Sequence, residues 1–364
     1  MNVKFVAPFS DYTGYGAAAR NTIAALNSAG VDITTEKIDF IADKIDTGWM
    51  GGLAEAFVDR PLNYKIKIIE LTAEHYPTYI EKDKYNIGVL FWETDRIPAK
   101  WVKPMNMMNE FWVFSEPTAE VFRKSGITSK LTVFPQCMDY SYYKNVTPYD
   151  LKGEYKFYSI FQWTERKNPK ALIQAFLKAF PYNDKVRLFI KAYRSNFTKA
   201  EFVAIREDAA RWRKEITDSP FPQIDLITNM LSNNDIIRLH QSCDCFVSAH
   251  RGEGWGMPQM EALALGKPVI STGYGGIHDW LTNKEAFLAP FKMVQVKGME
   301  WIPWYTPDQL WADVSSHYLI DRMQYVYKNQ KEAKKMGELA KIKTESMFDY
   351  HVVGPQMRKR LEEI

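Results

Sequence analysis

The stretch from Cys245 to Thr272 constrains the fold more than any other part of the chain, because an apolar run, a glycine-rich loop and a second apolar run follow one another there. Residues 245–249, Cys-Phe-Val-Ser-Ala, predict a buried strand. The loop that follows contains three glycines before Pro258. A proline suits the first turn of a helix, so residues 259–265 are predicted to be helical. Strand, glycine loop and helix in this order are typical of a parallel α/β sheet.

Two carboxylates lie in this stretch, Glu253 in the loop and Glu261 in the predicted helix, eight positions apart. Glycines allow backbone N–H groups to approach a ligand closely. A helix N-terminus favours an anion such as a phosphate. The pattern therefore predicts a site for an anionic ligand, in which one acid meets one end of the ligand and the second acid meets another part of it. An ordinary strand–helix unit with a solvated acid is the alternative interpretation.

The same stretch closely resembles the signature of the family 4 retaining glycosyltransferases (glycosyl transferases group 1), which have the GT-B fold. In that family a Glu, seven residues and a second Glu precede Ala-x-Ala-x-Gly-x-Pro-Val-Ile. Here Glu253 and Glu261 are followed by Ala-Leu-Ala-Leu-Gly-Lys-Pro-Val-Ile at 262–270, and then by Gly275 and Gly276. The resemblance implies an α/β fold of two Rossmann-like doubly wound domains facing across a cleft. It also implies a hexosyl- or pentosyltransferase that moves a sugar from a nucleotide-diphosphate sugar to an acceptor hydroxyl, with retention and without a metal or other cofactor.

Length and composition agree with two soluble domains. A chain of 364 residues is too long for one ordinary core. The sequence has no run of eighteen apolar residues, which predicts no transmembrane segment. The N-terminus lacks a signal-peptide pattern, and three cysteines cannot form a disulfide framework, so a cytoplasmic location is expected.

We expect four parts along the chain. Residues 1–139 are predicted as an N-terminal Rossmann-like, acceptor-side domain, and residues 140–153 as a linker rich in Tyr, Asn, Pro and Gly. Residues 154–345 are predicted as the C-terminal nucleotide-sugar-binding domain, with two helices over 306–344. By resemblance, residues 346–364 form a C-terminal helix that crosses back to the N-terminal domain.

Glycines and acids follow the predicted strands of the first domain. Gly14 and Gly16 come after the strand 3–7, and Glu93 comes after the strand 85–91. Ligands of parallel sheets bind beyond the carboxyl ends of strands. By resemblance, Gly14 and Gly16 face the donor phosphates. Many family members have a histidine where this chain has Glu93, so Glu93 is the candidate for holding or deprotonating the acceptor hydroxyl. The alternative interpretation, given equal weight, is that Glu93 is a loop acid that forms an ion pair with Arg96.

Gly14, Gly16 and Ala19 also fit the G-x-G-x-x-G/A dinucleotide fingerprint, with Glu36 about where such a fold places its ribose acid. An NAD-dependent oxidoreductase is therefore an alternative function. It is disfavoured because six residues separate Ala7 from Gly14, where the fingerprint needs a tight turn.

Two adjacent cations, Arg166 and Lys167, follow the predicted strand 157–162. Arginine binds an anion as a fork and lysine as a point charge. By resemblance they reach the donor's diphosphate, and a further family arginine is replaced here by Phe161. A solvated turn is the alternative interpretation.

The remaining donor contacts are also implied by the resemblance. Met230 lies in a stretch similar to the family's base-binding turn. Glu261 binds the ribose hydroxyls and Glu253 those of the donor sugar. The backbone around the sugar and phosphates is that of Gly254, Trp255, Gly256, Met257 and Pro258.

The acceptor is left open by the sequence. A glycan, a lipid-linked sugar, a protein, a small molecule and a modified nucleic-acid base all remain possible. Residues 1–150 contain 16 Lys and Arg against 19 Asp and Glu, which mildly disfavours a polyanionic acceptor. Because Glu93 and Phe161 depart from the family pattern, a non-catalytic nucleotide-sugar-binding protein is a further alternative.

Overall fold

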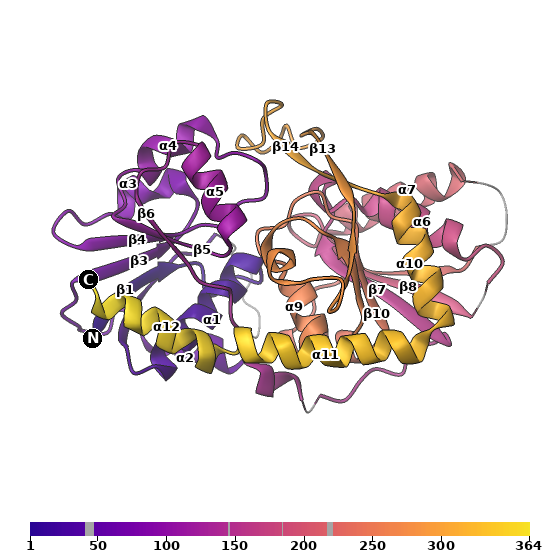
Figure 1. Ribbon diagram of the computed structural model, residues 1–364, viewed down its shortest axis with the longest axis horizontal. Coiled ribbons are helices and arrows are strands. Elements are labelled where there is room, and N and C mark those ends of the chain that lie inside the picture. Colours follow the sequence, from indigo (N-terminus) through magenta and orange to yellow (C-terminus); the bar gives the residue numbers. More distant parts are fainter. Residues whose placement is uncertain (41–46, 145, 184, 217–220) are drawn as a thin grey trace. The chain divides into compact units, whose positions relative to one another are not determined.

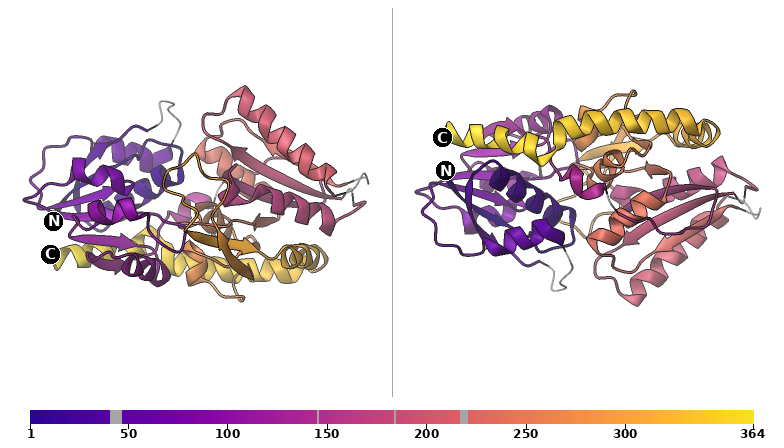
Figure 2. Two further views of the ribbon diagram at one scale, coloured as in Figure 1. Left: turned by 90° about the horizontal axis from the view of Figure 1, so that it is seen from above. Right: turned by 90° about the horizontal axis from the view of Figure 1, so that it is seen from below.

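The computed structural model describes residues 1–40, 47–144, 146–183, 185–216 and 221–364 (Figure 1). The chain divides into two compact units. The first comprises Met1–Tyr142 and Thr344–Ile364, and the second comprises Tyr143–Lys343. The chain returns from the second unit to the first within α11 (Gln330–Phe348), the long yellow helix of Figure 1 and Figure 2.

The first unit contains a six-stranded parallel sheet in the order β2-β1-β3-β4-β5-β6. Its strands are β1 (Asn2–Ala7), β2 (Asp32–Lys37), β3 (Ile66–Glu70), β4 (Tyr85–Val89), β5 (Glu110–Val113) and β6 (Lys130–Val133). Its helices are α1 (Gly14–Ser28), α2 (Gly48–Ala56), α3 (Tyr76–Tyr79), α4 (Ala99–Met105), α5 (Glu116–Lys124) and α12 (Tyr350–Glu362), with short 3-10 turns at Ala73–His75 and Tyr140–Tyr143. Because β1 has β2 on one side and β3 on the other, the sheet is doubly wound, as the sequence predicted.

The C-terminal helix α12 packs against α1 within this unit (Figure 1). The two backbones approach so closely that a Cβ atom at Gly354 would lie 2.2 Å from the Ala25 carbonyl oxygen. Arg360 of α12 also forms a buried ion pair with Glu110 of β5, with 2.6 Å between guanidinium nitrogen and carboxylate oxygen. The last residues of the chain therefore complete the first unit.

The second unit contains another six-stranded parallel sheet, in the order β12-β11-β10-β7-β8-β9. Its strands are β7 (Tyr155–Gln162), β8 (Val186–Tyr193), β9 (Gln223–Ile227), β10 (Cys245–Ser248), β11 (Val269–Thr272) and β12 (Phe287–Ala289). Its helices are α6 (Pro169–Ala179), α7 (Lys199–Lys214), α8 (Asn233–Ser242), α9 (Met257–Ala264) and α10 (Ser316–Lys328), with 3-10 turns at Glu165–Lys167 and Gly276–Trp280. The winding direction reverses between β7 and β10, and sheets of this kind bind ligands beside such a reversal.

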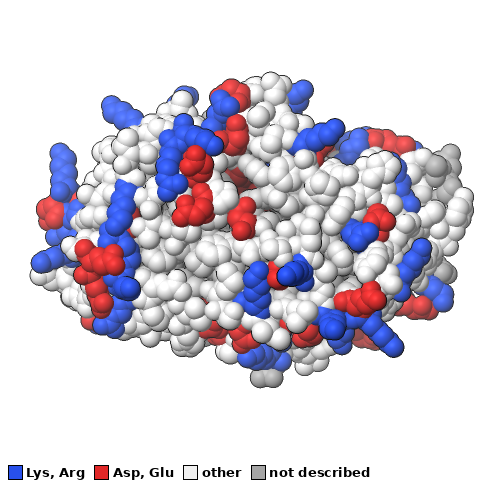
Figure 3. All heavy atoms as spheres, in the orientation of Figure 1, with Lys and Arg blue, Asp and Glu red and all other residues white. Residues whose placement is uncertain are grey.

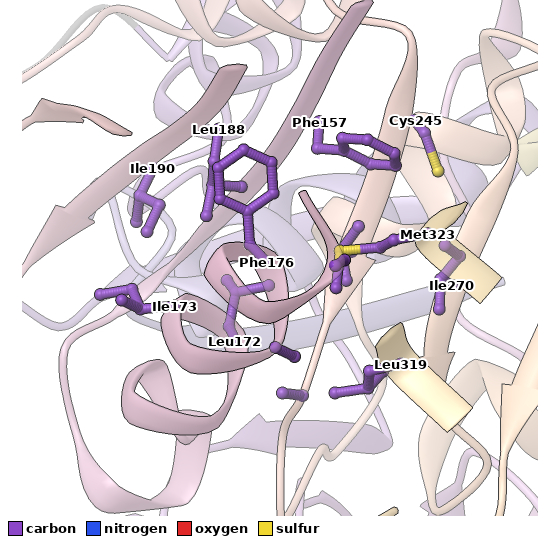
Figure 4. Close-up of a cluster of buried hydrophobic side chains, with 14 of the residues drawn as sticks. Phe157, Leu172, Ile173, Phe176, Leu188, Ile190, Cys245, Ile270, Leu319 and Met323 are labelled. Atoms are coloured by element: carbon purple, nitrogen blue, oxygen red, sulfur yellow. The ribbon is translucent and has the colours of Figure 1, made fainter. Parts of the chain in front are cut away.

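One face of the second sheet packs against α6 and α10 (Figure 4). Leu172 and Phe176 of α6 are four positions apart and so share one face of the helix. They meet Leu188 and Ile190, which alternate along β8. The two-residue period of a strand places Lys191 on the opposite face of this sheet.

The prediction of two helices over 306–344 is wrong at its start. Residues Leu310–Val314 form the strand β14, which pairs antiparallel with β13 (Phe291–Gln295). Trp311 is buried there against Val296 and Met299. The partner strand lies far enough upstream that the local sequence pattern did not reveal the pairing. The helices α10 and α11 follow β14.

Charged side chains of both signs are interspersed on the face shown in Figure 3. In the described ranges, the helices are all too short or too polar to cross a membrane.

Candidate functional site

Residues 252–256 form the last part of the loop between β10 and α9, and they pack directly on the turn Gly276–Trp280. Gly256 adopts a left-handed backbone with φ 99° as it caps α9, a conformation that favours glycine. The Ile277 N–H donates to the Trp255 carbonyl over 2.7 Å. A Cβ atom at Gly276 would lie only 2.2 Å from that same carbonyl oxygen. The glycines of both segments are thus needed for a close backbone approach beside the N-terminus of α9.

Glu253 forms an ion pair with Lys167, which stands in the 3-10 turn after β7. Arg166 lies beside them and donates to the Gly252 carbonyl over 3.0 Å. Burial alone would raise the pKa of the Glu253 carboxyl, but the charges of Lys167 and Arg166 outweigh this and hold its pKa at about 2. The structure therefore brings three predicted site residues together around an ionised carboxylate.

The turn that carries both cations is fixed by Arg251. The Arg251 N–H donates to the Arg166 carbonyl over 2.7 Å, and its guanidinium donates to the Glu165 carbonyl over 2.9 Å. Asn168 then adopts a left-handed backbone, φ 52°, from which α6 begins at Pro169. The cations thus stand on a braced turn at the carboxyl end of β7.

Glu261 lies in the second turn of α9, and both of its carboxylate oxygens are hydrogen-bonded within the second unit. Oε2 lies 3.0 Å from His240 Nε2, and Oε1 accepts from the Tyr143 hydroxyl over 3.2 Å. The other ring nitrogen, His240 Nδ1, lies 2.8 Å from the Tyr158 hydroxyl. Since a carboxylate only accepts, Nε2 carries the proton and Tyr158 donates to Nδ1. The orientation of Glu261 is therefore set by Tyr143 and by His240 of α8. Tyr158 of β7 in turn orients the His240 ring.

Sequence reasoning did not find His240, Tyr158 or Tyr143 as partners of Glu261. A weak signal existed for His240, because it lies three positions after Ile237 on the buried face of α8. Tyr158 had no signal, since an aromatic residue in an apolar strand is usually core.

Two more histidines are buried near Glu253. His250 Nε2 lies 3.0 Å from the Tyr274 carbonyl oxygen and Nδ1 lies 3.0 Å from the Ser248 hydroxyl. His278 Nδ1 donates to the Gly275 carbonyl over 2.9 Å. Burial lowers the pKa of His250 to about 3 and that of His278 to about 4. Both rings are therefore neutral supports of the loops that carry the site.

The remaining residues predicted for the second unit lie around α9 and the turn before α8. Gly254 and Trp255 are buried, and the Trp255 indole N–H faces the sulfur of Met260 at 3.2 Å, so Trp255 can offer a ligand only its backbone. Met257 and Pro258 form the first turn of α9 and are half-buried. Met230 is half-buried in the turn that leads to α8.

The glycine loop of the first unit lies beside the loop after β4. Gly14 begins α1, and a Cβ atom at Gly16 would lie 2.3 Å from the Asp11 carbonyl oxygen. Tyr15 donates from its hydroxyl to the Phe91 carbonyl over 3.3 Å. Burial raises the pKa of Tyr15, and the nearby charge of Glu93 raises it further. Gly14, Gly16 and Glu93 therefore gather at the carboxyl edge of the first sheet.

Two alternatives from the sequence can be compared with the contacts. Arg96, the suggested partner of Glu93, forms an ion pair of 3.1 Å with Asp95. Glu36, the ribose acid of the oxidoreductase alternative, forms an ion pair of 2.7 Å with Lys4.

The two Rossmann-like units, each built on a six-stranded parallel sheet, have the architecture of the GT-B fold. Residues 149–301 match the family of glycosyl transferases group 1. All of these residues lie in the second unit, and the match gives no support to the oxidoreductase alternative.

Known proteins are similar to this chain in sequence or in structure. An alpha-monoglucosyldiacylglycerol synthase of Streptococcus pneumoniae is 26% identical over 132 residues, which is 36% of this chain and only 27% of that relative's length. The structure of Anabaena HepE in complex with UDP and glucose is similar over 100% of both chains, with a TM-score of 0.70 and 15% identity. Sucrose-phosphate synthase of Thermosynechococcus elongatus gives a TM-score of 0.69 and 12% identity, over 100% of this chain and 98% of its own. These structural likenesses show the fold.

Proposed function

We propose that this chain transfers a sugar from a nucleotide-diphosphate sugar to an acceptor hydroxyl, with retention at the anomeric carbon and without a metal. The observation that carries the proposal is the grouping of ionised Glu253 with Lys167 and Arg166 at the N-terminus of α9. Diphosphate departure develops negative charge, and two fixed cations there stabilise it electrostatically.

Each predicted residue has a role in this reaction. Lys167 and Arg166 bind the leaving diphosphate, while Glu253 accepts hydrogen bonds from the donor sugar. Glu261 accepts from the two ribose hydroxyls, because each of its oxygens has a lone pair beyond the bond it already makes. In the first unit, Glu93 accepts the hydrogen bond of the acceptor hydroxyl, which attacks from the face that the diphosphate leaves.

The first donor to test is a UDP-sugar, because HepE, a neighbour in fold, was solved with UDP-glucose. The first acceptor to test is a diacylglycerol lipid, which is part of the name of the pneumococcal relative. Glycans, lipid-linked sugars, proteins, small molecules and modified nucleic-acid bases complete the acceptor panel.

The test is release of UDP from UDP-sugars by the full-length chain, measured with and without each acceptor and in the presence of EDTA. We expect acceptor-dependent release that EDTA does not reduce. Lys167→Gln should abolish release and Glu207→Gln, on the exposed face of α7, should leave it unchanged. Anomeric retention is read by NMR of the product.

A non-catalytic nucleotide-sugar-binding protein is the second candidate. It is favoured by Phe161, an apolar residue at the end of β7 where the resemblance expects a further cation. Tight binding of UDP-sugar with no release in any acceptor reaction would replace the first proposal by this one.

A further inference from the structure

Lys191 is a buried cation at the carboxyl end of β8, with 4% of its surface exposed. It points to the face of the sheet opposite Leu188 and Ile190, which lie in the core beneath α6. In the described part of the chain it forms no ion pair. Its ammonium instead lies 4.8 Å from the centre of the Phe197 ring and 5.7 Å from that of Tyr193.

An ammonium in this position is costly to the folded protein. Burial without a counter-ion disfavours the charged form, and it lowers the pKa of Lys191 to about 8. The group is still mostly protonated at neutral pH. Aromatic faces offset only part of the lost hydration. Because the buried charge destabilises the fold, a role in ligand binding explains this lysine better than a structural role does.

The Phe197 ring beside Lys191 is held in place by a hydrogen-bonded loop. Phe197 has a left-handed backbone with φ 53°, which side-chain-bearing residues rarely adopt. Its N–H donates to Glu201 Oε2 over 3.1 Å. The N–H groups of Ser195 and Asn196 donate to Glu201 Oε1, each over 3.0 Å. The Glu201 carboxylate therefore fixes the loop that places the ring beside the ammonium.

Lys191 lies between the two segments that a nucleoside diphosphate would touch. On one side is β7, whose carboxyl end leads to Arg166 and Lys167. On the other side, Lys191 is in register with Ile227, the last residue of β9, and Met230 follows three residues later. Adjacent strands are about 4.8 Å apart, so a ligand whose phosphates lie at β7 can extend its base over β8.

We propose that Lys191 recognises the nucleobase of the donor by donating a hydrogen bond from its ammonium to a carbonyl oxygen on the base edge. The rings of Tyr193 and Phe197 flank the same position and provide flat apolar surface. Uracil and guanine have such a carbonyl, whereas the corresponding edge of adenine carries an amino group that would repel the ammonium. This inference rests on the proposed function, because it names the base class of that donor.

The experiment measures the dissociation constants of UDP, GDP and ADP for the full-length chain by calorimetry. We expect the wild type to prefer UDP or GDP over ADP. Lys191→Met keeps the length of the side chain and removes its charge. Loss of one hydrogen bond to a charged group should weaken binding of the preferred nucleotide by about tenfold or more, with ADP changed by less than about twofold. Lys191→Arg, which keeps a donor, should retain part of the preference.

The outcomes separate this inference from the proposed function. Lys191→Met should melt no lower than the wild type, because a desolvated charge is removed, so a binding defect is not a folding defect. Equal weakening of all three nucleotides would assign Lys191 to the phosphates and overturn the base assignment. Unchanged binding of all three nucleotides would also overturn it. If the wild type bound none of the three nucleotides, the proposed function itself would fail and the base assignment with it.

Discussion

His240 Nε2 lies 3.0 Å from Glu261 Oε2, and the imidazole that makes this contact is fully buried. The ring receives the Tyr158 hydroxyl at its other nitrogen, over 2.8 Å. Glu261 is therefore aimed by residues that no ligand can reach. A carboxylate in a fixed orientation binds hydroxyls at less entropic cost than a mobile one. Substitutions at His240 should therefore weaken nucleotide binding although the nucleotide does not contact His240.

We expect His240→Leu to weaken UDP binding by about tenfold, since the hydrogen bond that orients the charged Glu261 is lost. His240→Gln is the matched variant, because its amide nitrogen can still donate to the carboxylate. Calorimetric titration with UDP measures both. Identical affinities for the two variants would mean that His240 supports packing alone.

Glu261→Gln should raise the dissociation constant of UDP by an amount equivalent to about 1–3 kcal/mol, as expected for a lost hydrogen bond to a charged group. UDP without a sugar should already show the effect, because the contact is to the ribose. Glu207→Gln, an exposed change on α7, is the control and should bind as the wild type does. Unaltered UDP affinity in Glu261→Gln would exclude Glu261 as the ribose ligand.

The ion pair of Glu253 with Lys167 makes stability depend on pH in a defined direction. The pKa of Glu253 is lowered in the folded chain to about 2, from an ordinary value of 4.5. A lowered carboxyl pKa stabilises the fold above the ordinary value, and this stabilisation is lost as pH falls through the range between the two values. Glu253→Gln should therefore be less stable than the wild type at neutral pH, and the difference should shrink as pH falls below 4.5 towards 2.

Urea unfolding of the wild type and Glu253→Gln at about pH 7 and about pH 3.5 measures that difference. Lys167→Met is the partner variant. Without the lysine the Glu253 pKa should rise towards the ordinary value of 4.5, so the stability lost as pH falls from 4.5 should be smaller than in the wild type. A difference in unfolding free energy that is the same at both pH values would contradict the assignment.

Arg360 and Glu110 hold α12 to the sheet of the first unit. Glu110 is fully buried and also accepts from the Thr132 hydroxyl over 2.6 Å. Arg360→Met should destabilise the chain by about 3–5 kcal/mol, because a buried carboxylate loses its counter-ion. The double variant Arg360→Met with Glu110→Gln removes both charges and should recover part of the loss. The midpoint of urea unfolding measures both, and a double variant less stable than the single one would argue against a pairing effect.

The local part of the site could be predicted from the sequence because its signals are local. Glycine and proline around 252–258 placed a strand before the loop and a helix after it, and the structure has β10 ending at Ser248 and α9 beginning at Met257. The doubly wound sheets followed from the alternation of apolar runs with helical patterns.

What the sequence did not reveal depends on contacts between distant residues. Lys167 and Glu253 were each predicted as site residues, yet their ion pair joins positions 86 apart and requires β7 and β10 to be neighbours. His240 meets Glu261 for a similar reason, across α8 and α9. The strand β14 was not predicted because the strand that pairs with it, β13, is separated from it by a long loop. In each case the contact depends on how separate elements pack against one another, and no local pattern encodes it.

Glu93 is the residue at which this chain leaves the family pattern, and its side chain is half-buried after β4. Its charge acts on Tyr15, which follows Gly14, so it stands beside the glycine loop of the same unit.

A general base contributes typically about 10²–10⁴-fold to a rate. We therefore expect Glu93→Gln to reduce turnover by about that factor while UDP-sugar binding stays intact, because the donor contacts lie on other residues. Asp95→Asn is the matched control and should do much less, since Asp95 already pairs with Arg96 at 3.1 Å. Steady-state rates together with UDP-sugar titrations decide between them. Greater damage from Asp95→Asn would place the role two residues later, and near-normal turnover in both variants would leave His75 or the donor's own phosphate to accept the proton.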